Sequence, residues 1–353
     1  MVGSPDRTVY RAGIIGCGRI ADSIEDEVRD ALYWSLLPYS HAGAYQRCDR
    51  TQLIAAADPN PERLASFGRR RGVEHLYNDY QEMLAYESLD IVSICAPTRA
   101  HADIALGVAQ YPVKAIYLEK PIAQSLAEAD RMLAAFQAGG ITVAVNHIRT
   151  YDPIYGRIRR LITEGAIGVP HAIIAHRKEG ALFGGTHLFD LLRFLLDAEA
   201  EWVFGTLDAG SGRFDPGARG IIGFPAGVQA YVSGAEVSAA SAELDIVGTG
   251  GRIRVGNERY PELSQLDWSR TRPALVRRGF PGVTDGRSGM LRAVTALVEA
   301  IEGGEQPAST AADARRDLEI AVAFHLSHRR EATVRLPVKE TTYVIADPWG
   351  RDG

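Results

Sequence analysis

The chain of 353 residues has only three cysteines, Cys17, Cys48 and Cys95. They lie far apart and form no C-x-x-C pair, so we expect neither disulfides nor a zinc site, and we predict a reducing, cytoplasmic location. The N-terminus lacks the basic and apolar segments of a signal peptide. No apolar stretch is long enough for a transmembrane helix.

A large excess of charge is also absent. The 39 basic and 44 acidic residues give a net charge of -5, which argues against nucleic acid as a partner. The sequence shows no internal repeats and no low-complexity segments. With 46% hydrophobic and 24% charged residues, the composition is that of a globular protein with room for about two domains.

Strands and helices alternate in the first part of the chain. The expected strands are Thr8–Ile15, Gln52–Ala57, Leu89–Ala96, Lys114–Leu118 and Ile141–Asn146, and the expected helices cover 60–71, 78–85, 100–110 and 125–138. This alternation predicts a Rossmann-type, doubly wound parallel sheet in a domain over 1–147. The carboxyl ends of such strands share one edge, where ligands bind.

A glycine-rich turn follows the first strand. Gly16-x-Gly18-x-x-Ala21 has the G-x-G-x-x-G/A spacing of dinucleotide-binding turns, in which a helix N-terminus faces the pyrophosphate. Asp58, after the second strand, would accept hydrogen bonds from the ribose and repel a 2′-phosphate, which favours NAD over NADP. Asp58 lies 40 residues beyond Gly18 rather than about 20. We therefore expect an insertion at about 22–40, which either folds over the ligands or forms an oligomer contact.

The fourth expected strand ends in Glu119-Lys120-Pro121. Charged residues directly after a buried strand are costly unless the strand end opens onto a crevice. Lys120 is therefore a candidate catalytic residue. Taken alone, the tripeptide is explained equally well as surface charge that closes a strand.

The second part of the chain has a different pattern. A helix over 152–163, a strand over 171–177 and a helix ending near 196 precede five strands at 202–209, 220–224, 228–233, 243–247 and 252–255. Consecutive strands without helices between them predict an antiparallel sheet. Helices over 288–302 and 311–327 and a strand over 332–336 complete an α+β domain over 148–353.

Several motifs carry a family resemblance. They are the glycine-rich turn, the acidic end of the second strand, Pro97-Thr98-x-x-His101, Glu119-Lys120-Pro121, Asn146-His-x-Arg149-x-x-Asp-Pro153 and Gly185-Thr186-His187-x-x-Asp190-x-x-Arg193. In this order, they resemble the glucose–fructose oxidoreductase / inositol dehydrogenase / rhizopine-catabolism (Gfo/Idh/MocA) family over nearly the whole chain. The resemblance implies that Lys120 is the main catalytic residue, that the Lys120-Pro121 bond is cis, and that the open face of the second sheet joins subunits into a homodimer or homotetramer.

His187 is the expected base. Oxidation of an alcohol by NAD needs an acceptor for the hydroxyl proton, and the positive end of a helix dipole keeps a histidine neutral. Thr186 is a possible N-cap, and Asp190 either orients the ring or binds a substrate hydroxyl. A capping or core histidine is the alternative, which the family resemblance disfavours.

One position departs from the family pattern. Many polyol dehydrogenases of the family have an aspartate four residues before the histidine, where this chain has Phe183. Polar recognition must then come from other residues, and a basic cluster that includes His147, His176, Arg177 and Lys178 would suit an anionic group. Solvated charges at a strand end explain that cluster equally well.

The predicted sites are as follows. The expected cofactor-binding residues are Gly16, Gly18, Arg19, Ile20, Asp58, Ala96, Pro97, Thr98, His101, Glu119, Lys120 and Asn146. The expected substrate-binding residues are Lys120, Arg149, Tyr151, Arg177, Thr186, His187 and Asp190, and no metal is expected. The predicted function is an NAD-dependent oxidoreductase acting on a sugar, sugar derivative or cyclitol. The alternatives are an enzyme that recycles tightly bound NAD, as in sugar–sugar oxidoreductases and oxidoreductive glycosidases, and a non-catalytic dinucleotide-binding regulator.

Overall fold

The computed structural model describes residues 8–29, 37–177, 180–208, 215–234, 242–256, 261–269, 271–282 and 286–346. It divides into two units. The first comprises Met1–Tyr151 and Gly286–Ala314, and the second comprises Asp152–Asp285 and Arg315–Gly353. Part of the expected insertion, residues 30–36, lies outside the described residues, as does Lys178. In the described part of the chain, no helix is both long and apolar enough to cross a membrane.

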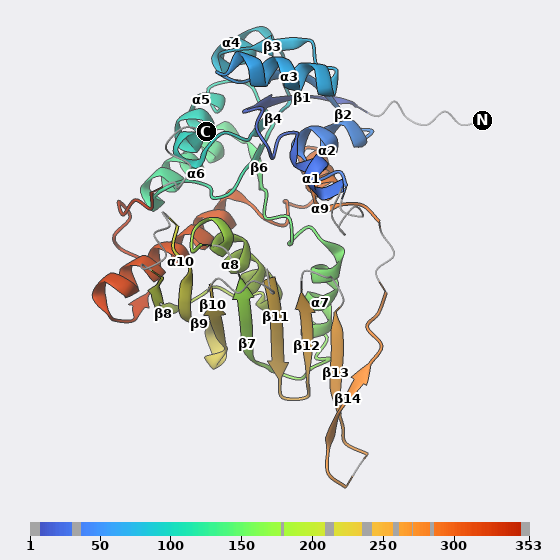
Figure 1. The fold of residues 1–353 in the computed structure, drawn as a ribbon, viewed down its shortest axis with the longest axis vertical. Coiled ribbons are helices and arrows are strands. Elements are labelled where there is room, and N and C mark those ends of the chain that lie inside the picture. Colours follow the sequence, from blue (N-terminus) through green and yellow to red (C-terminus); the bar gives the residue numbers. More distant parts are fainter. Residues whose placement is uncertain are drawn as a thin grey trace, which may run out of the picture. The chain divides into compact units, whose positions relative to one another are not determined.

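The first unit is built on a parallel sheet (Figure 1). Within the described residues it has six strands in the order β3-β2-β1-β4-β5-β6. These are β1 (Tyr10–Ile15), β2 (Thr51–Ala57), β3 (His75–Tyr77), β4 (Ile91–Ile94), β5 (Ala115–Leu118) and β6 (Thr142–Val145). Chain order reverses at β1, which pairs with both β2 and β4, so the predicted doubly wound sheet is confirmed. The short strand β3 was not expected.

Helices connect the strands of this sheet. They are α1 (Ile24–Arg29), α2 (His41–Arg47), α3 (Pro61–Arg71), α4 (Tyr80–Tyr86), α5 (Thr98–Val108) and α6 (Leu126–Gly139). Local signals set their ends. For example, the Asn60 side chain accepts from the amides of Glu62 and Arg63 at the start of α3, and Gly72 ends that helix at a positive φ of 66°.

One later helix returns to the first unit. The apolar side chains of α9 (Gly289–Ile301), including Met290, Val294 and Leu297, enter the same core as Tyr45 of α2 and Tyr117 of β5. Helix α9 contacts α2, and Figure 1 shows the two helices in the same region of the first unit. The expectation of one continuous second domain over 148–353 did not include this return, because the pattern of α9 indicates an apolar face but not the sheet that this face covers.

The second unit is built on a mostly antiparallel sheet. In the described ranges it has nine strands in the order β14-β13-β12-β11-β7-β10-β9-β8-β15, and only the β7–β10 pair is parallel. The strands are β7 (Pro170–Arg177), β8 (Trp202–Leu207), β9 (Ala218–Gly223), β10 (Gln229–Ser233), β11 (Ala242–Gly248), β12 (Gly251–Gly256), β13 (Glu262–Asp267), β14 (Ala274–Arg278) and β15 (Val334–Arg335). The fold class is confirmed, although β13 and β14 were not expected.

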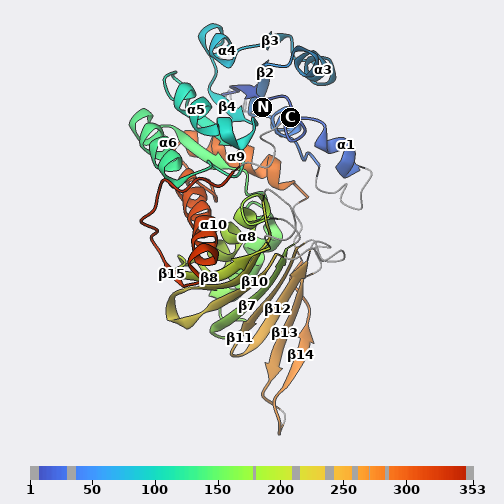
Figure 2. The same cartoon turned by 60° about the vertical axis from the view of Figure 1, so that its left-hand side comes forward.

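Three helices belong wholly or mainly to the second unit. They are α7 (Pro153–Thr163), α8 (Phe183–Leu196) and α10 (Ala311–Arg330). Helix α8 contacts β7, and Phe324 of α10 lies so close to Gly205 of β8 that a side chain at Gly205 would collide with it. Figure 2 shows α8 and α10 on one side of the sheet. The alternate strand residues on the opposite face include exposed Phe204, Ile174 and Tyr231.

Candidate active site

The glycine-rich turn after β1 has the geometry that a dinucleotide requires. Gly16 has φ of 90°, and a Cβ there would lie 2.8 Å from the backbone nitrogen of Ala96. A Cβ on Gly18 would meet no heavy atom of the described residues within 4 Å, so the backbone is open on that side with respect to them. This open backbone fits the close approach of a pyrophosphate.

The helix expected directly after the turn is interrupted. Residues 18–23 form turns, and α1 begins only at Ile24. The amides of His41 and Ala42 in α2 donate to the carbonyls of Ile20 and Ala21 at 3.3 and 3.0 Å. Helix α2 thus takes the place of the helix that was expected directly after the glycine-rich turn. The residues between Ala21 and Ser40 are inserted between this turn and α2, and this insertion accounts for the long spacing to Asp58.

Asp58 is buried at the end of β2. Its two carboxylate oxygens accept hydrogen bonds from the amides of Cys17 and Asn60, each at 2.8 Å. Arg63 lies 3.7 Å from Asp58 and provides a nearby cation. The fixed carboxylate therefore lies next to the glycine-rich turn, as expected for a ribose-binding residue. The expected cofactor residue Arg19 is exposed and forms a two-pronged ion pair with Glu27.

The ends of β4 and β5 are joined by His101. Its Nε2 lies 2.8 Å from the Ala96 carbonyl, and its Nδ1 lies 2.8 Å from the Pro121 carbonyl. Burial lowers the pKa of His101, and these carbonyls act in the opposite direction. The ring is thus engaged by the backbone, which favours a positioning role over direct cofactor contact. Pro97 precedes α5 and Thr98 begins it, both next to this junction.

Glu119 and Lys120 follow β5, and the Lys120-Pro121 bond is cis, as the family resemblance implied. Lys120 is half-buried, whereas Glu119 is buried. Burial opposes ionisation of Glu119, but a hydrogen bond from His41, the charge of Lys120 and a hydrogen bond from Asn146 act in the opposite direction, and the pKa of Glu119 is lowered. A carboxylate is therefore held beside Lys120.

The expected residues after β6 have different environments. Asn146 is buried and contacts Glu119 through Nδ2 at 2.5 Å. Arg149 is half-buried. The Tyr151 hydroxyl donates to the Ser309 carbonyl at 3.2 Å and accepts from the Ser309 amide at 3.3 Å, so it anchors the returning segment inside the first unit. This geometry disfavours a substrate contact for Tyr151.

In the second unit, Thr186 and His187 lie buried in the first turns of α8. The expectation that Thr186 caps this helix is wrong, because α8 begins at Phe183 and the Thr186 amide already donates to the Leu182 carbonyl. The cap comes from Asp215, whose carboxylate accepts from the amides of Leu182 and Phe183, each at 2.9 Å. The start of the helix that carries His187 is thus fixed by a residue distant in sequence.

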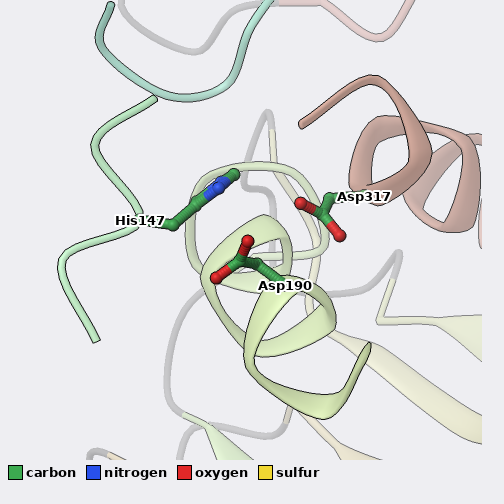
Figure 3. A group of neighbouring side chains, drawn as sticks. All are labelled: His147, Asp190 and Asp317. Carbon is green, nitrogen blue, oxygen red and sulfur yellow. The ribbon is translucent and has the colours of Figure 1, made fainter. Parts of the chain in front are cut away.

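Two buried aspartates lie together in the second unit. Asp190 projects from α8 and Asp317 from α10, with carboxylate oxygens within 4.8 Å of one another (Figure 3). Arg193 of α8 donates to Asp317 at 2.9 Å and binds both oxygens of Glu199. Figure 3 also labels His147, which belongs to the first unit, where its Nδ1 lies 2.9 Å from the Ser309 hydroxyl.

The basic cluster at the end of β7 does not stay together. Arg177 is buried on the face of the sheet that is covered by the helices. His176 lies opposite Ser233 and Glu243 in the strand register and points to the open face. Consecutive residues of a strand alternate between faces, so these two side chains serve different surfaces. The sequence did not single out Asp215, Ser93 or the role of His41, because nothing in their local sequence marks the partners they contact.

Comparisons with known proteins agree with this geometry. Residues 10–147 match a family model described as an oxidoreductase family with an NAD-binding Rossmann fold. The chain is 24% identical over 351 residues to the myo-inositol 2-dehydrogenase of Thermotoga maritima, an alignment that covers 92% of this chain and 98% of that protein. It is 25% identical over 360 residues to the D-apiose dehydrogenase of Paraburkholderia graminis, with 93% and 90% coverage. An oxidoreductase domain protein from Kribbella flavida shares the fold, with a TM-score of 0.78, 19% identity and coverage of 94% and 100%.

Proposed function

We propose that this chain transfers a hydride between NAD and a hydroxyl- or keto-bearing carbon of a sugar, sugar derivative or cyclitol, because residues 10–147 match the model of the Gfo/Idh/MocA oxidoreductase family and the chain is similar to sugar and inositol dehydrogenases along most of its length. The observation that supports this proposal most strongly is the set of residues at one edge of the first sheet. There, the open backbone at Gly18, the fixed carboxylate of Asp58 and the buried Glu119 next to Lys120 follow three strands of one parallel sheet. Inositol and apiose dehydrogenases among the relatives support the substrate class.

Two residues have proposed catalytic roles. Lys120 donates a hydrogen bond to the reacting oxygen and stabilises the charge that develops on it. His187 accepts the hydroxyl proton during oxidation and returns it during reduction. NAD, when bound, supplies the hydride acceptor. Arg149, Arg177, Thr186 and Asp190 are the proposed residues for orienting the substrate, and Asp190 is the only carboxylate among them.

Amino-acid substitutions would test these roles. The unmodified protein should bind NAD by calorimetry and reduce NAD⁺ with at least one member of a panel of sugars and cyclitols. Lys120→Ala and His187→Ala should each lower kcat by about 10²- to 10⁴-fold, the usual contribution of a proton-transfer residue. Lys114→Ala is the matched control, because Lys114 pairs with Asp90 at the other end of β5. Full turnover by Lys120→Ala would refute its catalytic role, and absence of nucleotide binding would refute the proposed function.

Asp58 supports NAD rather than NADP as the cofactor. A 2′-phosphate would face this buried carboxylate, which already accepts two backbone hydrogen bonds. Asp58→Ser should lower the ratio of NAD affinity to NADP affinity by about tenfold, which corresponds to about 1.4 kcal/mol of binding free energy. Arg63 should then bind the added phosphate, so Arg63→Ala in the Asp58→Ser background should remove the gain. Calorimetric titration of the three proteins with both nucleotides measures the six affinities, and a ratio of NAD to NADP affinity that is unchanged in Asp58→Ser would contradict this assignment.

The open face of the second sheet is the proposed subunit interface. Phe204, Ile221, Tyr231 and Ile174 stand opposite one another across β8, β9, β10 and β7 and form an apolar row, of which Phe204, Tyr231 and Ile174 are 40–45% exposed. Such rows mark interaction surfaces. The protein should therefore be a homodimer or homotetramer by light scattering. Tyr231→Glu should shift it toward the monomer, and a monomeric unmodified protein would overturn this proposal.

A further inference from the structure

A chain of buried hydrogen bonds runs from helix α2 to the end of β5. The Tyr45 hydroxyl lies 2.8 Å from the Ser93 hydroxyl, which lies 2.8 Å from His41 Nδ1. His41 Nε2 lies 3.0 Å from Glu119 Oε1. Tyr45, Ser93 and His41 are fully buried, so these groups depend on one another rather than on water.

Glu119 is also held from its other side. Asn146 donates to Oε1 at 2.5 Å, and the Tyr117 hydroxyl donates to the Asn146 side-chain carbonyl at 2.7 Å, which fixes the amide orientation. The amide of Lys120 donates to Glu119 Oε2 at 3.2 Å. Both carboxylate oxygens are therefore engaged, and one of them contacts the backbone of the proposed catalytic lysine.

Counting donors and acceptors assigns a direction to each hydrogen bond in this network. An ionised Glu119 only accepts, so His41 must donate to it from Nε2. A neutral His41 ring then accepts at Nδ1 from Ser93, and Ser93 in turn accepts from Tyr45. A neutral His41 ring thus satisfies each of these hydrogen bonds, and the negative charge on Glu119 needs no second buried charge from His41.

A purely structural role would not require these groups. Buried polar networks seldom stabilise a fold more than apolar residues of similar size, and one that loses a member is costly. Here, the network ends on the carboxylate directly before Lys120, and the charge of Lys120 itself favours the ionised form of Glu119. Among the described residues, the charge of Glu119 also acts on the pKa values of Cys95, His101 and Tyr117, which are all buried. Lys120 is half-buried, so this charge can act on a ligand through it.

We propose that His41 is a positioning residue that holds the Glu119 carboxylate as a fixed anion beside Lys120 and thereby sets the charge state of Lys120. This inference rests on the proposed function, because it gives the network a purpose only if Lys120 is catalytic. The effect on Lys120 itself is, however, a property of the chain without cofactor or substrate.

The low lysine content makes this effect measurable. The chain has four lysines, Lys114, Lys120, Lys178 and Lys339, so competitive amine labelling of the protein across pH, read by peptide mass spectrometry, gives a titration midpoint for each. An anion beside an ammonium group stabilises the charged form, so Glu119→Gln should lower the Lys120 midpoint by about one unit. His41→Phe should shift it in the same direction, whereas His41→Gln, which can still donate to Glu119, should restore most of it.

Two controls separate this effect from general damage. The Lys114 midpoint should stay unchanged in each variant. Tyr45→Phe removes only the outermost hydroxyl, so it should leave the Lys120 midpoint within error of the unmodified value. If His41→Phe does not fold, Glu119→Gln and His41→Gln decide the question. A Lys120 midpoint that is the same in Glu119→Gln as in the unmodified protein would overturn the proposal.

Kinetics provide the second test. In the active enzyme, His41→Phe should lower kcat by about tenfold and shift the pH profile of kcat, with the NAD dissociation constant within about twofold of the original. An equal loss of NAD binding and turnover would indicate a merely structural role and contradict the proposal. Failure of the unmodified protein to bind NAD would refute the proposed function but leave the labelling result intact, so the two failures are distinguishable.

Discussion

The two units hold their candidate residues in different ways. In the first, Asp58 and Glu119 follow parallel strands and are fixed by hydrogen bonds from turns and side chains at the same sheet edge. In the second, Thr186, His187 and Asp190 share one helix, and distant residues fix that helix at its start and along its length. The placement of the candidate residues in the first unit thus depends on strand order, whereas in the second unit it depends on how α8 is anchored.

The largest expected effect is on stability, and it should come from breaking the ion pair that joins α8 to α10. Arg193 and Asp317 form a buried ion pair at 2.9 Å. Asp317→Ala leaves Arg193 without one of its partners, so it should lower the free energy of unfolding of the second unit by about 3–5 kcal/mol. Hydrogen exchange should rise in peptides of α8 and α10 and stay unchanged in the first sheet.

A double substitution sharpens the same test. Arg193→Leu with Asp317→Leu replaces the pair by apolar groups, so it should recover much of the loss. A single variant that loses less than about 1 kcal/mol would show that α8 is held by its apolar face and not by this pair.

The sequence predicted the structural positions of the candidate residues better in the first unit than in the second. Gly16, Asp58 and Glu119-Lys120 were identified because each follows a strand directly, and the edge of a parallel sheet collects such residues. Asp215 was missed because its partners lie 33 and 32 residues away, and no local pattern reveals a contact of that separation. The mistaken cap at Thr186 has the same origin, since a local rule was applied to a helix with a long-range cap. The return of α9 and the strands β13 and β14 likewise depend on tertiary packing.

The next effect concerns acid sensitivity of the second unit. Burial, assisted by the charge of His328, lowers the pKa of His325 in α10 to about 4. A histidine with a depressed folded pKa binds its proton more readily when unfolded, so stability should fall as pH drops from about 6.5 to about 4, by a total of about 3 kcal/mol. Urea unfolding across this window, compared with His325→Gln, measures the contribution. The lowered pKa of Glu119 has a different window, because its stabilisation is lost only as pH falls below the ordinary glutamate pKa of about 4.3.

The smallest expected effect on stability concerns the cap that Asp215 provides at the start of α8. Asp215→Ala removes the acceptor for the amides of Leu182 and Phe183, so it should cost about 1–2 kcal/mol, as for other N-caps. Asp152→Ala is the matched control, because Asp152 caps α7 through the Ile154 amide at 3.0 Å and α7 carries none of the candidate residues. Both variants should lose similar stability. Only Asp215→Ala should lower kcat, by about tenfold, with NAD affinity unchanged, because it alone displaces the turn that carries Thr186 and His187. Equal kcat values for the two variants would mean that α8 keeps His187 in place without its cap, and that the two units differ in sequence pattern but not in how tightly they hold their candidate residues.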